Sequence, residues 1–350
     1  MKQLIEMPND VIYHTVESYA VFKNVDKTIL ATNCFLEKFG YKFVCFNLEE
    51  LEKNFSALLS LPKKFESEHQ ICFQDNNFSI SNEFCQALMH NHEFGMPSII
   101  SKEVIFLKAI NDFEQAVVNN IVNMELADTH LGKMQSFVEV LIQQFRLFKN
   151  GCISCTSQFQ IRKDERNIPI KLWGPIGKSL SHSTFTLTES EVEILGTLFK
   201  DNFTSNELTE LAISNFNLSY DIADIKTKYI TLMTCLESLF NQGRDQITHT
   251  VSRHLALILS KSDEEFQKNY YRNKVLYNLR SAIVHGNQTN EDLSAATDEL
   301  QNKVRQAINF CLHLSDNKKQ LFDKLNAMGF DTTMKKKGLW RFIIPRCIGK

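Results

Sequence analysis

The chain has 350 residues, which exceeds the usual size of a single hydrophobic core and predicts two domains. Its 39 lysine and arginine residues nearly balance 41 acidic residues, which excludes a wholly basic coat for nucleic acid and confines any polyanion contact to a local surface. The nine cysteines are scattered without framework spacing, which favours reduced thiols in a cytoplasmic protein. Since neither a signal peptide nor a run of ~18 apolar residues is visible, we expect a protein without a membrane span.

Residues 1–123 are rich in Phe and alternate short apolar runs with Asn, Asp, Pro and Gly, which predicts a smaller mixed α/β domain. Strands are predicted at 41–47 and at 69–74 paired with 78–81, with the hairpin turn at 75–77. A helix is predicted from 51 to 61, because Pro62 follows it. The role expected for this domain is sensing a trigger or restraining the rest of the chain.

Apolar residues recur at helical spacing from 124 to 148, which predicts a helix buried on one face. We place the domain boundary before this helix, so the second domain is predicted to cover 124–325. The alternating segment that starts at Gly151 and the stretch up to STFTLT predict a small β insertion near 152–187 within that domain.

The remainder reads as helices, because capping-box spacing recurs at Thr188 with Glu191, at 204 with 207, and at Ser262 with Glu265. The expected fold is α+β overall, with an all-α bundle in the C-terminal half. The predicted helices cover 189–200, 205–218, 221–241, 245–260, 263–285 and 291–316.

The segment from 270 to 288 is the most informative part of the sequence. Tyr271, Val275, Leu279, Ala282 and Ile283 predict its apolar stripe, and the glycine at 286 ends the helix.

His285 then falls in the last helical turn, five positions after Arg280. An imidazole can take and give protons at cellular pH, and a guanidinium can clamp a phosphate with two parallel hydrogen bonds. These groups suit metal-independent RNA cleavage, in which the ribose 2′-hydroxyl attacks phosphorus and leaves a 2′,3′-cyclic phosphate. On an ideal helix the two side chains point to different sides. We therefore favour a homodimer in which each cleft takes residues from both chains.

A second pair with this spacing, Arg244 and His249, stands at a predicted helix start, where the helix dipole opposes a histidinium. We interpret this pair as coincidence.

At residues 277–286, YNLRSAIVHG, the sequence resembles the Apea-like branch of the HEPN family, helical domains of bacterial abortive-infection and toxin systems. LMTCLESLF at 232–240 and SRHLALIL at 252–259 resemble two of the family's helices. AISNF at 212–216 and FRLFKNGCIS at 145–154 resemble earlier segments. The resemblance covers about 128–314.

The resemblance implies that Arg280 and His285 are the catalytic pair, with Ser281 as the polar neighbour and with Tyr277 and Asn278 as further motif residues. Glu237 takes the family's acidic position, where it either orients Arg280 through an ion pair or holds two helices together. Arg253 offers an alternative partner that would leave Arg280 unpaired.

The C-terminal tail, 326–350, is basic and contains aromatic residues, a combination that can hold single-stranded RNA. A solvated chain end is the ordinary alternative. The candidate RNA-binding residues are Lys335, Lys336, Lys337, Trp340 and Arg341.

The remaining patterns predict neither a cofactor nor a metal site. The pair Cys152 and Cys155 lacks a second pair to complete four ligands. His90 and His92, with Glu93 beside them, are interpreted as surface residues.

Two functions from different classes follow. The first is an endoribonuclease with an anti-phage or toxin role, cutting single-stranded loops, with transfer RNA as a candidate substrate and a regulatory protein as a further partner. The alternative is a non-catalytic HEPN module that binds RNA, nucleotide or a protein.

Overall fold

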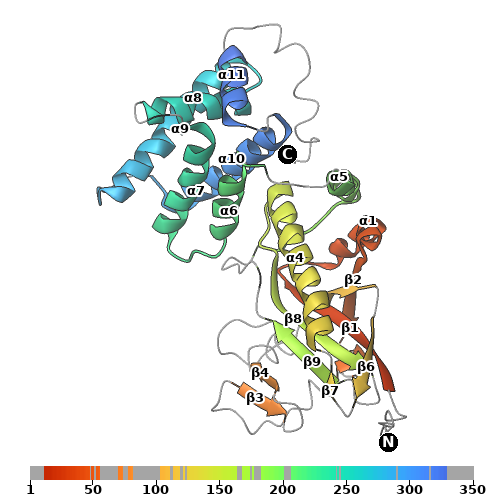
Figure 1. The fold of residues 1–350 in the computed structure, drawn as a ribbon. Helices are drawn as coiled ribbons and strands as arrows, with labels where there is room; N and C mark the ends of the chain where they lie inside the picture. Colours follow the sequence, from red (N-terminus) through yellow and green to blue (C-terminus); the bar gives the residue numbers. More distant parts are fainter. Residues whose placement is uncertain are drawn as a thin grey trace, which may run out of the picture. The chain divides into compact units, whose positions relative to one another are not determined.

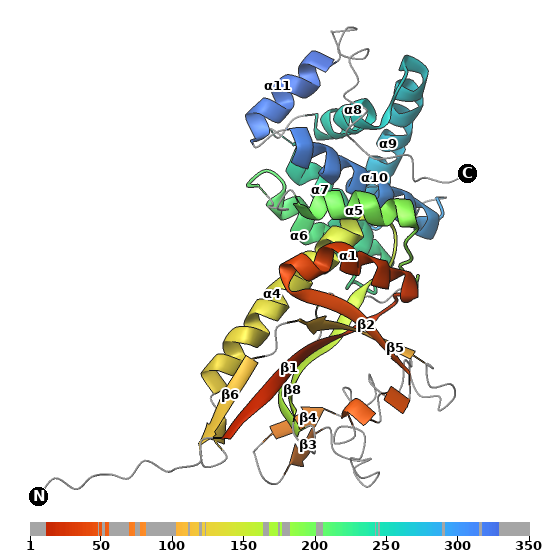
Figure 2. The same ribbon diagram turned by 90° about the vertical axis from the view of Figure 1, so that its right-hand side faces the viewer.

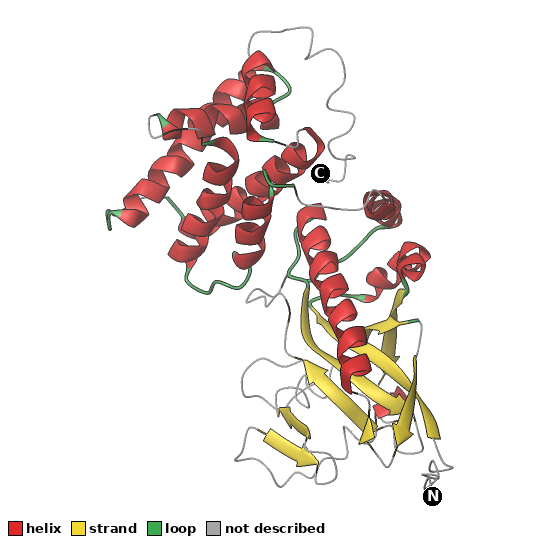
Figure 3. Ribbon diagram, in the orientation of Figure 1, coloured by secondary structure: helices red, strands yellow, loops and turns green. Residues whose placement is uncertain are grey.

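The computed structural model describes residues 12–47, 49–50, 53–55, 70–73, 78–81, 103–110, 113–118, 121–122, 124–163, 168–173, 176, 183–200, 206–241, 243, 246–288, 291–314 and 317–328. The chain is mixed α+β and divides into two compact units (Figure 1). The sheet unit comprises 1–142, 153–178 and 184–192, and the helical unit comprises 143–152, 179–183 and 193–350. In Figure 3 the strands gather in the first unit, and the second is built of helices.

The sheet unit contains a seven-stranded sheet in which every pairing of strands is antiparallel. The central strand is β1, which pairs along one edge with β6 in its first half and with β5 in its second half, and along the other edge with β8. The strands of the sheet are β1 (Ile12–Lys23), β2 (Tyr41–Asn47), β5 (Glu103–Ala109), β6 (Phe113–Val118), β7 (Ile121–Val122), β8 (Ser154–Lys163) and β9 (Ile168–Trp173).

Helix α4 (Met124–Phe148) lies along one face of this sheet (Figures 1 and 2). Its predicted apolar positions, Leu131, Met134, Val138 and Leu141, are fully buried, as a stripe with a period near 3.6 residues requires. Short helical segments follow the central strand before β2 begins. They are η1 (Lys27–Thr32), α1 (Asn33–Leu36) and η2 (Glu37–Phe39).

The segment near 152–187 was predicted to be a β insertion within the helical domain, and this prediction was wrong. β8 pairs with β1 from Thr15 opposite Lys163 to Lys23 opposite Ser154, so these strands belong to the sheet of the first unit. The predicted boundary before Met124 also differs, because the units divide inside α4, after Ile142. The reason in both cases is strand pairing between segments more than 130 residues apart, which a local pattern does not reveal.

The strand predicted at 41–47 is β2. The predicted hairpin is present as β3 (Gln70–Phe73) and β4 (Phe78–Ser81), paired antiparallel, and its turn lies outside the described residues. Of the helix predicted from 51 to 61 only 53–55 is described, and these residues are helical. The strands β1 and β5 were not predicted.

In the helical unit, the helices from residue 210 onward pack around one apolar core, which includes Tyr229, Leu236, Phe216, Leu300 and Phe310. Its helices are α5 (Glu189–Lys200), α6 (Glu210–Leu218), α7 (Ile225–Phe240), α8 (Ile247–Leu259), α9 (Asp263–Val284), α10 (Leu293–Leu314) and α11 (Lys318–Met328). The first four residues of α5 belong to the sheet unit. Except for α11, each corresponds to a predicted helix.

Of the three predicted capping boxes, the one at Thr188 is complete, whereas at Ser262 the Glu265 amide donates to the serine hydroxyl and the Glu265 carboxylate accepts from the Lys261 amide instead. Thr188 accepts a hydrogen bond from the Glu191 amide at 3.3 Å, and the Glu191 carboxylate accepts one from the Thr188 amide at 2.8 Å. Such reciprocal bonds satisfy amides that a helix start leaves unpaired. The box predicted at 204 lies outside the described residues. Within the described helices, none combines the length and apolar character needed to cross a membrane.

Candidate active site

Helix α9 carries the two residues of the proposed pair, and both its ends are set by local interactions. At its start, Ser262 accepts a hydrogen bond from the Glu265 amide at 3.2 Å, which satisfies one of the amides that a helix start leaves unpaired. At its end, Gly286 adopts φ +71°, and the Asn287 amide donates to the Ala282 carbonyl at 2.9 Å. A left-handed residue with this bond is a common helix terminator. The predicted end of α9 is therefore confirmed, and His285 is the C-cap residue.

The buried face of α9 differs from the predicted stripe. Its buried residues are Asn273, Leu276, Tyr277 and Leu279, whereas Tyr271 is 63% exposed and Val275 39% exposed. The prediction was wrong for Tyr271 and Val275, which score as apolar in any pattern, but Leu279 is buried and Ile283 packs against the core. The core instead accepts the polar Asn273 through hydrogen bonds. The Asn273 amide donates to the Ser252 carbonyl, and its oxygen accepts from Lys303.

Arg280 lies on the side of α9 that faces α7, where it meets an acidic side chain. Its Nε is 3.5 Å from Oε1 of Glu237, and the two side chains retain 32% and 21% exposure. The same Oε1 accepts a hydrogen bond from the Tyr277 hydroxyl at 2.7 Å. One carboxylate oxygen thus ties together two residues that lie one helical turn apart on α9.

The electrostatics of this cluster act most strongly on Tyr277. Burial raises the pKa of its hydroxyl well above the usual range, and the bond to Glu237 and that group's negative charge raise the pKa further. The hydroxyl therefore stays protonated at any physiological pH and acts as a permanent donor to Glu237.

Of the two arginines considered as partners of Glu237, the structure pairs Arg280 with it. Arg253 lies on α8 and its Nη1 donates to Oδ1 of Asn326 on α11, at 3.4 Å. The sequence left this choice open because both arginines stand near motif-like segments.

His285 is exposed at the C-terminus of α9, and its backbone amide donates to the Ser281 carbonyl at 3.0 Å. Within the described part of the chain, no hydrogen bond or ion pair joins its ring to Arg280. On an ideal helix, a spacing of five residues directs the two side chains to different sides.

The other motif residues of α9 lie between these sides. Ser281 is half-buried and Asn278 is exposed. The predicted RNA-binding tail residues, Lys335, Lys336, Lys337, Trp340 and Arg341, lie outside the described residues, as do Arg244 and the histidines at 90 and 92.

Several contacts that fix α9 in place were not predicted. The Tyr229 hydroxyl of α7 donates to the Leu276 carbonyl at 2.7 Å. Arg272 of α9 forms ion pairs with Glu291 at 3.0 Å and with Glu299 of α10 at 2.8 Å. The sequence shows only that a basic residue lies in one predicted helix and acidic residues lie in or near the next. That observation does not reveal which of them pair.

The cysteines and acids of the described residues form no group of three or more that could hold a metal. Cys152 and Cys155 are both buried free thiols, and burial raises the pKa of Cys155 to about 12. Comparisons with protein families, with curated proteins and with solved structures returned no match for this chain.

Proposed function

We propose that the protein is a metal-independent endoribonuclease of the HEPN type. Arg280 and His285 are its catalytic residues, and the α-helical unit is its HEPN domain. The observation that carries the proposal is the ion pair between Glu237 and Arg280, which holds the guanidinium on a helix that ends in an exposed histidine. The proposal also rests on the resemblance of residues 277–286 to the family motif.

The geometry of Arg280 suits a phosphate clamp. Glu237 lies closest to Nε, which leaves the two Nη groups of the guanidinium to donate to phosphate oxygens. The side chain is one-third exposed, so a nucleotide can approach it from solvent. Fixed positive charge at this position would stabilise the phosphorane that develops during attack.

His285 would act on the protons of the reaction. Its imidazole removes the proton from the ribose 2′-hydroxyl as the bond from O2′ to phosphorus forms. The bond from phosphorus to the 5′-oxygen then breaks, and that oxygen takes a proton from the imidazolium, which returns His285 to its neutral form. The products are a 2′,3′-cyclic phosphate and a 5′-hydroxyl end. The proposed reaction requires no oxidant, metal or cofactor.

We further propose a homodimer with two-fold symmetry, because a spacing of five residues directs the two catalytic side chains to different sides of an ideal helix. In such a dimer, Arg280 of one chain and His285 of its partner would share each cleft. The substrate would be single-stranded or loop RNA, with transfer RNA as a candidate, in a cytoplasmic toxin or abortive-infection role. The sheet unit would sense the trigger or receive a regulatory partner.

The direct test is incubation of purified protein with total transfer RNA in excess chelator, followed by mapping of RNA ends. We expect cyclic phosphate ends from the wild type and a loss of at least about 100-fold in rate for Arg280→Ala and for His285→Ala. Arg280→Lys keeps the charge but loses the planar fork, so its rate should fall between these values.

The matched control is His313→Ala, because His313 is another exposed histidine in the last turn of a helix. Its activity should equal that of the wild type. Identical RNA ends from the wild type and from both catalytic variants, with none of them cyclic, would contradict the nuclease proposal. RNA binding without cleavage would then favour the alternative, a non-catalytic HEPN module.

A further inference from the structure

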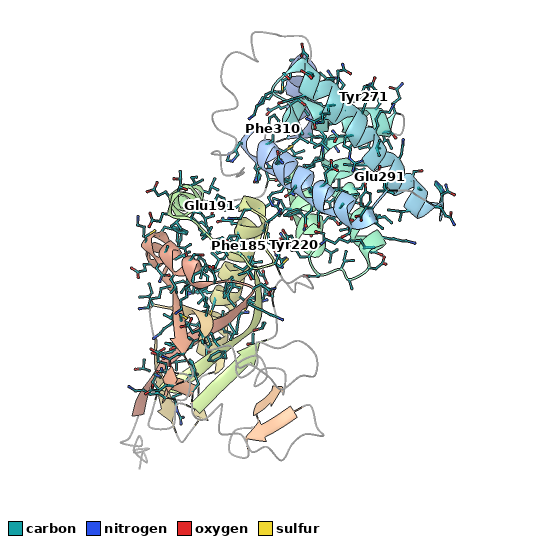
Figure 4. All side chains as sticks on the ribbon, turned by 180° about the vertical axis from the view of Figure 1, so that it is seen from behind. Phe185, Glu191, Tyr220, Tyr271, Glu291 and Phe310 are labelled. Carbon is teal, nitrogen blue, oxygen red and sulfur yellow. The ribbon has the colours of Figure 1, made fainter. Side chains whose placement is uncertain are left out.

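The outer side of α9 carries a cluster of aromatic and cationic side chains that the proposed chemistry does not use. Tyr271 is 63% exposed, and Figure 4 shows it on the outer side of its helix. Tyr270 stacks on Phe266 with centroids 6.1 Å apart and meets the ring of Tyr271 edge-on at 5.7 Å. Core packing, the ordinary role of tyrosines at this spacing, therefore does not apply to Tyr271.

A lysine and a histidine lie beside these rings. The Lys274 ammonium lies 5.7 Å from the centroid of Tyr270, and the ring of His249, from the first turn of α8, meets Tyr270 edge-on at 5.8 Å. Lys268 is also exposed. We call Phe266, Tyr270, Tyr271, Lys274 and His249 the α9 platform.

From Phe266 to Gln288 the sequence contains no acid. Of its four lysines and arginines, Arg272 and Arg280 form ion pairs with acids of neighbouring segments. Lys268 is exposed and Lys274 lies beside the Tyr270 ring. The acids Asp263, Glu264 and Glu265 belong to the first turn of the helix and bound the platform at that end. A surface with exposed aromatic rings and positive charge complements the bases and phosphates of a single strand.

We propose that the α9 platform binds single-stranded RNA, with one base stacked on Tyr271 and with Lys274 and His249 beside the backbone phosphates. This inference rests on the proposed nuclease function for its choice of RNA. Fourteen residues separate Tyr271 from His285, which places them about 21 Å apart along α9 and within about 40° of the same side. The exposed Asn278 lies between them. A strand held at the platform would thus run along α9 toward His285.

The platform can be tested without cleavage, using full-length protein and a fluorescent oligonucleotide of 2′-O-methyl RNA. This probe lacks the free 2′-hydroxyl that the proposed reaction requires. By fluorescence anisotropy, Tyr271→Ala should weaken binding at least about five-fold, since stacking of one base contributes about 1–3 kcal/mol. Tyr271→Phe should bind within about two-fold of the wild type, because its ring can still stack.

Two further variants separate stacking from general effects. Lys274→Gln should reduce the slope of log affinity against log salt by about one. Leu211→Ala removes a side chain of α6 that is 58% exposed, and it should leave binding unchanged. A Tyr271→Ala protein that binds the probe as well as the wild type would overturn the proposal.

A second copy of the chain is the competing occupant of this surface. If Tyr271→Ala converts a dimer to a monomer in sedimentation at micromolar concentration, the surface is an interface between copies and the platform proposal fails. Failure of the nuclease proposal has a different signature, because a protein that binds the probe through Tyr271 but yields no cyclic ends retains the platform. Both readouts are obtained from the same preparations.

Discussion

Glu237 shows how a single oxygen atom can fix the direction of a catalytic candidate. Its Oε1 receives the Tyr277 hydroxyl at 2.7 Å and lies 3.5 Å from the Arg280 Nε. A buried donor that meets a charged acceptor contributes more than a neutral pair. The carboxylate therefore both joins α7 to α9 and orients the guanidinium, so that the two roles considered for Glu237 coexist.

We expect Tyr277→Phe to destabilise the helical unit by about 1.5–3 kcal/mol, because the variant removes a hydrogen bond to a charged group. Urea unfolding followed by circular dichroism measures the change. Asn278→Ala, at the exposed neighbouring position, is the control and should change stability by less than about 0.5 kcal/mol. Equal stability of the two variants would show that the Tyr277 bond contributes nothing.

We expect Glu237→Gln to lower cleavage by about ten-fold through kcat rather than KM, because misdirected catalytic groups lose transition-state contacts. Unlike Glu237→Ala, this variant keeps an oxygen that can accept from Tyr277. Single-turnover kinetics on a defined RNA measure the effect. A purely structural role predicts a lower melting temperature with an unchanged rate for the folded protein.

His254 is a buried histidine in the core of the helical unit, where its ring meets Phe322 edge-on at 4.9 Å and Phe240 at 6.0 Å. Burial, followed by the charge of Arg253, lowers the pKa of this imidazole to about 4. The folded chain therefore keeps the ring neutral at pH values where the unfolded chain protonates it.

The sign of the pH effect follows from these two pKa values. Above about pH 6.5 the ring is neutral in both the folded and the unfolded chain, so His254 causes no pH dependence of stability. As the pH is lowered from about 6.5 to about 4, the unfolded chain binds a proton that the folded chain does not, and the free energy of unfolding decreases by about 3 kcal/mol in total. Urea unfolding across this range measures the loss. His254→Phe should flatten the profile, and His285→Gln, at an exposed site, should not. A profile unchanged by His254→Phe would contradict the prediction.

At the scale of the element, α9 is defined by its two ends and by the helices it contacts. Ser262 caps the start, and Gly286 ends the helix at φ +71°. A side chain on a residue in the left-handed region strains the backbone, whereas nothing lies within 4 Å of a Cβ added at Gly286. The glycine is required by its conformation and not by space.

We expect Gly286→Ala to destabilise the helical unit by about 1–2 kcal/mol, which is the cost of a left-handed alanine. Gly243→Ala is the matched control, because Gly243 has equal space around it and no positive φ. Thermal unfolding of both variants provides the comparison. Equal melting temperatures would mean that the chain can end α9 without the left-handed residue.

At the scale of the whole molecule, the order of segments along the chain does not match the two units. The sheet unit takes β8 and β9 from the middle of the chain, while 143–152 belongs to the helical unit. In that unit Arg305 donates to the Arg146 carbonyl at 2.7 Å, and the Arg146 guanidinium lies 4.2 Å from the centre of the Tyr220 ring. Short pieces of chain thus complete each core.

This interleaving predicts that a fragment of residues 124–350 will be insoluble. Without β1, strand β8 becomes an unpaired edge, and its buried Phe159 and Ile161 meet water, a combination that promotes aggregation. Size-exclusion chromatography of the fragment tests this, and co-expression with residues 1–123 should restore solubility. A monodisperse fragment would contradict the prediction.

The shared-cleft dimer makes a prediction for mixtures of inactive chains. If Arg280 and His285 act across two chains, mixing Arg280→Ala with His285→Ala chains should restore about a quarter of wild-type cleavage, since half of the dimers are mixed and each has one intact cleft of two. Cleavage of RNA by the refolded mixture measures this. A mixture without activity, from variants shown to exchange chains, would rule out the shared cleft.

The sequence by itself determined what depends on near neighbours. The bounds of α4, the start and end of α9 and the strand β2 all follow from periodicity, capping residues and a helix-ending glycine. Each of these signals acts within a few residues, because capping bonds and helix hydrogen bonds join positions three or four apart.

Only the tertiary structure decided which distant segments meet. In the structure β8 pairs with β1, and Glu237 forms an ion pair with Arg280 and not with Arg253. Tyr271 is exposed, whereas Asn273 is buried. These outcomes depend on contacts between residues far apart in the chain, where many partners have equivalent chemistry. Packing in three dimensions selects one of them, and no local pattern records that selection.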